Sequence, residues 1–242
     1  MTRSPHRVQL TTGYLLHHHP WRDSSRILEV FTREHGRLTV FARGVRGPSA
    51  RLAPVLQSFQ LLLLSWSGRG EAPQLTGAER AHTCAVLPRE CLLACFYLNE
   101  LLMRLTTRHD PLPELFDNYH ATLEALRGGA PLAPALRVFE KRLLELLGYA
   151  LNLATEAHSG APLAPHGWYQ FRPALGFVAV PRETAGALAG DSLVNLAQEN
   201  LSGARVLEDA RRVLQAALGV CLEGRPLSTR AVAKSVLRKA AR

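Results

Sequence analysis

The sequence lacks the long apolar run that a membrane-spanning helix needs, because no stretch of about 18 uncharged apolar residues occurs. The basic residues 1–7 are followed by a short apolar segment that polar side chains interrupt, which argues against a secretory signal. We therefore expect a cytoplasmic protein with no membrane partner.

Cysteine is scarce as well: the only four are Cys84, Cys91, Cys95 and Cys221. Cys91 and Cys95 lie four residues apart on an expected helix, and no second close pair completes a zinc quartet. We expect buried free thiols of a reducing compartment. No metal or other cofactor is expected.

The common catalytic motifs are missing. The chain has no Gly-x-x-x-x-Gly-Lys phosphate loop, no Gly-x-Ser-x-Gly elbow and no His-Glu-x-x-His helix. Neighbouring side chains of a strand point to opposite faces, so the run His17, His18 and His19 cannot converge on one metal ion. We read the run as a solvated strand end and expect no enzyme; a metal hydrolase using these histidines is the weaker alternative.

Residues 35–70 contain no acidic residue. The whole chain is basic, with 29 Lys and Arg against 20 Asp and Glu and a net charge of +9. Five arginines fall in that segment: Arg37, Arg43, Arg46, Arg51 and Arg69. Three of them occupy a loop rich in Gly, Pro and Ser at residues 43–54. Long arginine side chains on a loop can follow a phosphate backbone, so we expect all five to contact DNA.

The first eighty residues have the pattern of short strands. Runs rich in β-branched, aromatic and leucine residues cover 8–16, 27–32, 38–42, 59–65 and 74–80, and turn signals separate them. Five short strands of this size favour an OB-fold barrel over a sandwich fragment. We expect Phe31 and Phe59 in the core, whereas Trp21 and Trp66 could be core or stacking residues.

Beyond Pro88 the period becomes helical. Apolar residues recur on one face over residues 93–105, 113–127 and 134–147, and Gly148 is a plausible C-terminal cap. More helix is expected over 204–218 and 228–239. The expected fold is α+β: an OB-fold domain at residues 1–82, then a helical domain at 83–242 with a small irregular or β insertion at about 153–181.

The last expected helix carries a second basic surface, because Arg230, Lys234 and Arg238 step by four along one face. Such a stripe is often only a solvated face. Together with the arginine loop, it favours binding of nucleic acid or of an acidic peptide, and we include these three residues among the DNA contacts.

Several motifs, taken in order, resemble the recombination mediator RecO family. Leu16-x-x-x-Pro20-Trp21-x-x-Ser24, Ala42-Arg43-Gly44 and residues 68–71 are similar to its N-terminal barrel. Residues 97–102, 136–140 and 147–149, and the late Gly224-Arg225-Pro226-Leu227-Ser228-Thr229-Arg230, are similar to its helical part. Many relatives carry a four-cysteine zinc site near residues 152–160, but this chain has no cysteine there. It resembles the zinc-less, proteobacterial type, and the region must hold its shape by packing.

The resemblance implies a DNA-repair and recombination mediator near the nucleoid. Its implied partners are single- and double-stranded DNA, the acidic tail of single-strand-binding protein and RecR, with RecA loaded indirectly, and its implied activity is strand annealing. A tail carboxylate needs an arginine beside an apolar slot. We assign that role to Arg137 with Tyr97, Phe139 and Lys141, an exposed helix arginine being the alternative for Arg137. The alternative for the whole chain is a non-enzymatic OB-fold RNA-binding or ribosome-associated protein.

Overall fold

The computed structural model describes residues 7–46 and 51–233. The chain forms two compact units: unit 1 holds residues 1–123 and 227–242, and unit 2 holds residues 124–226. Unit 2 is therefore inserted between two stretches of unit 1. The boundary that we expect at residues 82–83 stays a prediction.

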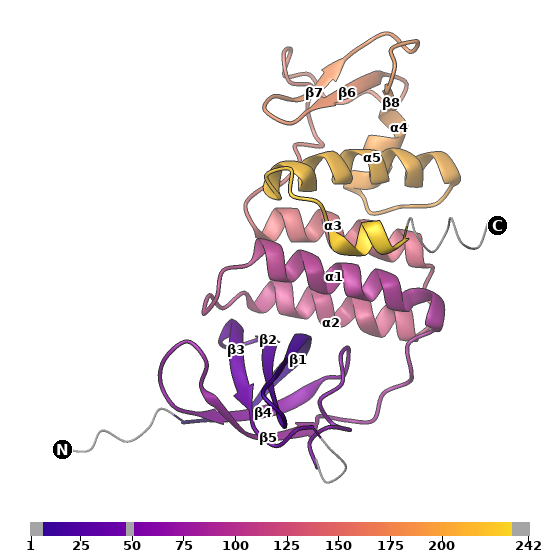
Figure 1. The fold of residues 1–242 in the computed structure, drawn as a ribbon. Coiled ribbons are helices and arrows are strands. Elements are labelled where there is room, and N and C mark those ends of the chain that lie inside the picture. The colour runs from indigo at the N-terminus through magenta and orange to yellow at the C-terminus, as the bar shows by residue number, and fades with distance from the viewer. Residues whose placement is uncertain (1–6, 47–50, 234–242) are drawn as a thin grey trace. The chain divides into compact units, whose positions relative to one another are not determined.

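The first part of unit 1 is a closed five-stranded barrel, coloured indigo to purple in Figure 1. The strands are β1 (Arg7–Trp21), β2 (Ser25–Thr32), β3 (Gly36–Ala42), β4 (Leu62–Ser67) and β5 (Gln74–Arg80). Their order is β1-β2-β3-β5-β4, and β1 pairs with both β2 and β4. A small closed barrel of five strands confirms the expected OB-fold.

Alternation along the strands separates the two faces of the barrel wall. Leu28 and Val30 of β2 and Leu38 and Val40 of β3 point into a dry core, all at most 2% exposed. Residues that alternate with these along the strands, such as Phe41 after Val40, lie on the outer face. Trp66 is 5% exposed and belongs to the core, which decides between its two expected roles.

The turn between β2 and β3 requires a glycine. Gly36 has a φ of +66°, and a Cβ there would lie 2.0 Å from the carbonyl oxygen of Asp110. The Thr32 hydroxyl donates to the Gly36 carbonyl oxygen at 3.0 Å and closes the turn. Only a residue without a side chain fits this close approach.

Helices of unit 1 pack on the outside of the barrel. They are η1 (Arg89–Cys91), α1 (Leu92–Leu105) and the part of α2 (Pro113–Arg127) up to residue 123. The ring of Tyr14 meets that of Phe116 at 5.6 Å and that of Tyr119 at 5.0 Å, and Phe31 joins this cluster. Asn99 donates to the Leu16 carbonyl oxygen at 2.9 Å, so one buried amide fixes α1 to β1.

Unit 2 is mainly helical. It contains α3 (Leu132–Leu146), α4 (Gly190–Ala197) and α5 (Ala204–Cys221), and a small sheet of order β7-β6-β8 formed by β6 (Trp168–Arg172), β7 (Gly176–Ala179) and β8 (Leu188–Ala189). Helix α5 packs against both α3 and α4. The α+β class is confirmed.

Some expected boundaries are wrong. Strand β1 continues through the histidine run to Trp21, and β4 begins at Leu62 because Phe59 has a φ of 67° that ends an extended run. The sequence pattern does not anticipate α4, which has eight residues, or β8, which has two. Residues 228–233 are helical, as expected, and residues 234–239 lie outside the described part.

Candidate nucleic-acid and peptide interfaces

The arginine loop, residues 43–54, is part of the connection between β3 and β4, and its residues 47–50 lie outside the described part. Arg43, Arg46 and Arg51 are all exposed, and no ion pair joins any of them to a carboxylate of the described residues. The Arg46 backbone N–H donates to the Ser24 carbonyl oxygen at 3.0 Å, and its guanidinium donates to the Arg22 carbonyl oxygen at 3.0 Å. The loop is thereby tied to the turn between β1 and β2.

Arg37 and Arg69 differ in their surroundings. Arg69 is exposed in the connection between β4 and β5. The side chain of Arg37 is only 12% exposed and pairs with Glu29 at 3.0 Å, while two of its nitrogens donate to Thr106 at 3.1 and 2.8 Å. Its hydrogen-bonding capacity is used inside unit 1, so we leave Arg37 out of the proposed DNA surface.

Glu29 is the centre of this internal network. Its carboxylate accepts from Thr39 at 2.7 Å, from Arg37 at 3.0 Å and from Arg108 at 2.5 Å. Burial by itself raises the pKa of Glu29, but the hydrogen bonds from Thr39, Arg108 and Arg37 outweigh it and hold the pKa below its ordinary value. The buried charge is therefore compensated.

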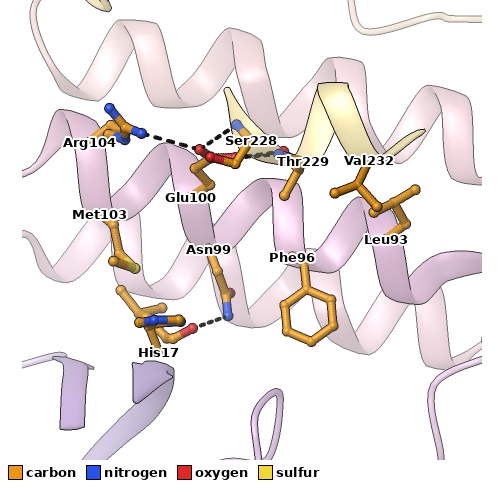
Figure 2. Close-up of a pocket in the computed structure, with 11 residues that line it drawn as sticks. His17, Leu93, Phe96, Asn99, Glu100, Met103, Arg104, Ser228, Thr229 and Val232 are labelled. Carbon is orange, nitrogen blue, oxygen red and sulfur yellow. Dashed lines mark hydrogen bonds and ion pairs between the residues drawn. The ribbon is translucent and has the colours of Figure 1, made fainter. Parts of the chain in front are cut away.

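The late Gly-x-Pro-Leu-x-x-Arg motif begins the helix at residues 228–233, which returns to unit 1. The Glu100 carboxylate accepts from the backbone N–H groups of Ser228 and Thr229 at 2.8 and 2.9 Å and from the Thr229 hydroxyl at 2.7 Å, as Figure 2 shows. Burial by itself raises the pKa of Glu100, but the hydrogen bonds from Thr229 and Ser228 outweigh this effect and hold the pKa below its ordinary value. A carboxylate at a helix N-terminus satisfies free N–H donors and the helix dipole.

Arg230, which we expect to contact DNA, extends from the same short helix. Its guanidinium carbon lies 5.7 Å from the centre of the Tyr97 ring, a cation–π distance that partly occupies it. Lys234 and Arg238, the other two members of the expected stripe, lie outside the described residues. The stripe therefore stays a prediction.

A pocket of about 460 Å³ lies between α1 and this returning helix, and the sequence patterns do not reveal it. Leu93, Phe96, Met103 and Val232 supply its apolar lining, and Figure 2 shows Phe96 and Val232 projecting from the two helices. Glu100 is its acidic member but is already paired. In the sequence, the helical spacing of Leu93, Phe96 and Met103 is the pattern closest to a sign of this pocket. The same spacing is equally typical of residues that pack into a core.

The expected tail-binding residues of α3 lie in unit 2. Arg137 is 7% exposed, so the alternative of an exposed helix arginine is wrong. Its Nη2 donates to Glu140 at 2.8 Å, whereas its Nε and Nη1 have no hydrogen-bond partner among the described residues. Unpaired buried guanidinium nitrogens are costly, and an incoming carboxylate oxygen would satisfy them.

The other expected tail contacts have different environments. Phe139 is fully buried, so it can act only by packing. Lys141 pairs with Glu145 at 2.9 Å and with Glu199 at 3.2 Å. Tyr97 belongs to unit 1 and is 8% exposed.

The histidine run is the end of β1. Register places His17 opposite Glu29 and His19 opposite Ile27, on one face, with His18 on the other. Burial is the main cause that lowers the pKa of His17 and of His18, so both rings are neutral near pH 7. Within residues 7–46 and 51–233, no group of three His, Cys, Asp or Glu side chains is arranged to hold a metal ion.

Glu156 organises the segment near residues 152–160, where we expect packing and no zinc. Its carboxylate accepts from the backbone N–H groups of His158, Ser159 and Ala179 and from the Ser159 hydroxyl at 2.6 Å. The Ser159 bonds are the main cause that lowers the Glu156 pKa to about 2. A hydrogen-bonded carboxylate thus supplements the packing that we expect to hold this region.

We expect chelation with EDTA to leave the melting temperature unchanged, whereas Glu156→Gln lowers it. Glutamine loses one strong acceptor where four N–H and O–H donors converge. The wild-type contribution should be complete above pH 4.5, the ordinary pKa, and should decline as pH falls toward about 2. Calorimetry across pH checks both parts, and a melting temperature that falls with EDTA would contradict the first.

Comparison with known proteins identifies the family. A family model described as "Recombination protein O N terminal" matches residues 7–83, and one described as "Recombination protein O C terminal" matches residues 89–230. The chain belongs to the RecO family. Together the two RecO matches span both compact units, in the order that the sequence motifs follow.

Individual RecO relatives are similar over nearly the whole chain. Each of three is named DNA repair protein RecO. The relative from Methylococcus capsulatus is 43% identical over 231 residues, which cover 96% of this chain and 95% of the relative. Those from Ralstonia nicotianae and Nitrosococcus oceani are 40% and 39% identical, covering 95% and 96% of this chain and 85% and 95% of the relatives. These names support a role in DNA repair and do not favour the RNA-binding alternative. None of the described helices is both long and apolar enough to cross a bilayer.

Proposed function

We propose that the chain is a non-enzymatic recombination mediator that binds single-stranded and double-stranded DNA through its barrel. The observation that carries this proposal is the arginine loop: Arg43, Arg46 and Arg51 are exposed beside an OB-fold barrel, in a segment without a carboxylate. Guanidinium groups that form no ion pair can contact phosphates without reading base sequence. Arg69 adds a further exposed charge on the same barrel.

Replacing Arg43, Arg46 and Arg51 together with alanine should weaken single-stranded DNA binding and flatten its salt dependence. Each phosphate contact on a single strand contributes about 0.7 to the log–log slope, so the slope should fall by about 2. Fluorescence anisotropy of a labelled oligonucleotide at several salt concentrations measures both quantities.

The matched control removes three exposed arginines from unit 2: Arg182, Arg205 and Arg211. The net charge falls by the same amount, but the barrel surface is untouched. Equal losses in the two triple variants would mean that only the overall charge matters, and an unchanged slope in the first would move the DNA site away from the loop.

The second part of the proposal is a receptor for the acidic tail of single-strand-binding protein at Arg137. The support is the pair of unpartnered nitrogens on this buried guanidinium. The two nitrogens point to different edges of the guanidinium plane, so a terminal carboxylate would accept from one of them once a local movement uncovers it. Lys141 adds positive charge one helical turn along α3.

Annealing follows from these two activities. A protein that holds one strand and also engages a protein coating the second brings complementary bases together. We propose further that the chain acts with RecR to promote RecA loading, and that it works in the cytoplasm at the nucleoid. Annealing of complementary oligonucleotides coated with single-strand-binding protein, with and without its tail, tests the annealing step directly.

A further inference from the structure

A row of rings lies on the outer face of β1 near its end. His17, His19 and Trp21 are two residues apart, so they share one face with about 6.6 Å between successive Cα positions. The rings of His17 and His19 meet edge-on with 4.4 Å between centroids. Trp21 ends the row and is 46% exposed.

The neighbouring strands extend this face sideways. His19 is opposite Ile27, and Ile27 is opposite Phe41, so a histidine and a phenylalanine flank one aliphatic side chain across three strands. Phe41 is partly exposed, and the Arg43 guanidinium carbon lies 5.7 Å from its ring centre. The part of the face nearest the turn is thus aromatic with a cation at its edge. His17, at the other end, lines the pocket beside α1.

The turn that carries Trp21 is held in a costly conformation. Arg22 has a φ of 50°, which is unfavourable for a residue with a side chain. The two hydrogen bonds from Arg46 to Ser24 and Arg22 fix this turn against the arginine loop. Asp23 is the one carboxylate of the turn, and it forms no ion pair with the described residues. The exposed indole is therefore held next to the proposed phosphate contacts.

We propose that this outer face, with Trp21 as its main element and His19 and Phe41 beside it, is a stacking platform for the unpaired bases of single-stranded DNA. This inference rests on the proposed DNA-binding function and adds the groups that contact the bases. Exposed rings spaced along a strand, beside cations that take the phosphates, are the arrangement that binds single strands without sequence preference. The strands 2 and 3 face and the adjoining loop are where OB-folds bind oligonucleotides. The histidine run then contributes ring surface to this face.

Stacking separates base contact from phosphate contact, and the experiment uses that difference. Binding of the full-length protein is measured by anisotropy with oligo(dT) and with an abasic sugar–phosphate strand of equal length. Trp21→Ala should weaken oligo(dT) binding about five- to a hundredfold, because one stacked base contributes that much. Binding of the abasic strand should not change. Trp21→Phe, which keeps a ring, should retain most of the affinity for oligo(dT).

A second readout follows the indole directly. The control variant Trp168→Phe removes the tryptophan of unit 2, whose ring centre lies 5.3 Å from the Arg182 guanidinium carbon. Two tryptophans then remain, the exposed Trp21 and the buried Trp66. In that background oligo(dT) should quench the fluorescence of Trp21, and the abasic strand should not.

The outcomes distinguish the inference from the function beneath it. If wild type binds neither strand, the proposed DNA-binding function is wrong. If wild type binds both, but Trp21→Ala binds oligo(dT) equally well or loses both strands to the same extent, the stacking platform is wrong and the phosphate contacts stand. Quenching by the abasic strand equal to that by oligo(dT) would also overturn it.

Discussion

Replacing Arg37 with methionine is expected to lower the free energy of unfolding by about 3 kcal/mol. Methionine keeps much of the side-chain volume but leaves Glu29, which is 5% exposed, without its buried cation. Removing one partner of a buried pair costs about 3–5 kcal/mol, and the lower end applies because Arg108 still reaches the carboxylate. The hydroxyl oxygen and the carbonyl oxygen of Thr106 each lose the hydrogen bond that Arg37 donates. Urea denaturation measures the change.

Arg33→Met is the matched control. Arg33 also pairs with a carboxylate, that of Asp117 at 2.9 Å, but the two side chains are 49% and 53% exposed. An exposed pair contributes about 0–1 kcal/mol. Similar losses for the two variants would show that burial does not decide the strength of these pairs.

The effect of Arg37→Met should also depend on pH. The folded-state pKa of Glu29 lies below its ordinary value of 4.5, so the charged network stabilises the fold fully above that pH. The contribution declines as pH falls through the lowered pKa, because the carboxylate becomes protonated. The difference between wild type and Arg37→Met should therefore narrow in acid. A difference that widens there would contradict the assignment of the charge to Glu29.

Replacing Arg137 with alanine is expected to weaken binding to the acidic tail of single-strand-binding protein about tenfold to a hundredfold. A charge-assisted hydrogen-bonded partner contributes about 1.5–3 kcal/mol, and the proposal requires a local movement that uncovers the buried, unpartnered Nε or Nη1 of Arg137. Binding to naked DNA should be nearly unchanged if that site lies on the barrel loop. Annealing of coated strands should fail while annealing of free strands proceeds. Calorimetric titration with a tail peptide gives the affinity.

Two further variants separate recognition from folding. Arg142→Ala removes an exposed arginine of the same helix that already pairs with Glu199, so tail binding should hardly change. Arg137→Lys keeps a charge near Glu140 but loses the planar fork, so an intermediate affinity is expected. If Arg137→Ala binds the tail as tightly as wild type, the receptor lies elsewhere, and Arg230 is the next residue to test.

Local patterns were sufficient for most of the fold. Strands β2, β3 and β5 and helices α1, α2, α3 and α5 follow from alternation, helical spacing and turn residues, because each buries one regular face. Strand β1 was harder to delimit. The sequence indicates a turn at residues 20–24 and a strand end at the histidines, yet β1 continues to Trp21 because cross-strand pairing with β2 sustains it.

The candidate site was predicted less well because charge alone does not show where a side chain points. Arg37 belongs to a basic segment, but the turn at Gly36 brings it next to Glu29 on the adjacent strand. Arg37 and Glu29 are eight residues apart on either side of a tight turn, and this spacing is the feature of the sequence that could have indicated their contact. Arg137 and Glu140 are three apart on α3, so they can neutralise one another inside, which a list of basic residues does not reveal.

The bond between Glu100 and Ser228 has a consequence for the order of events during synthesis. The two residues are 128 positions apart, so at about 5–20 residues per second the ribosome needs about 6–25 s to supply the partner of Glu100. Until then the apolar residues of α1 that the returning helix meets stay uncovered on the nascent chain. The inserted unit is synthesised entirely within this interval. A chain that ends near Pro226 would therefore carry the complete insertion on an unfinished first unit, whose uncovered apolar residues are the kind of surface that chaperones bind.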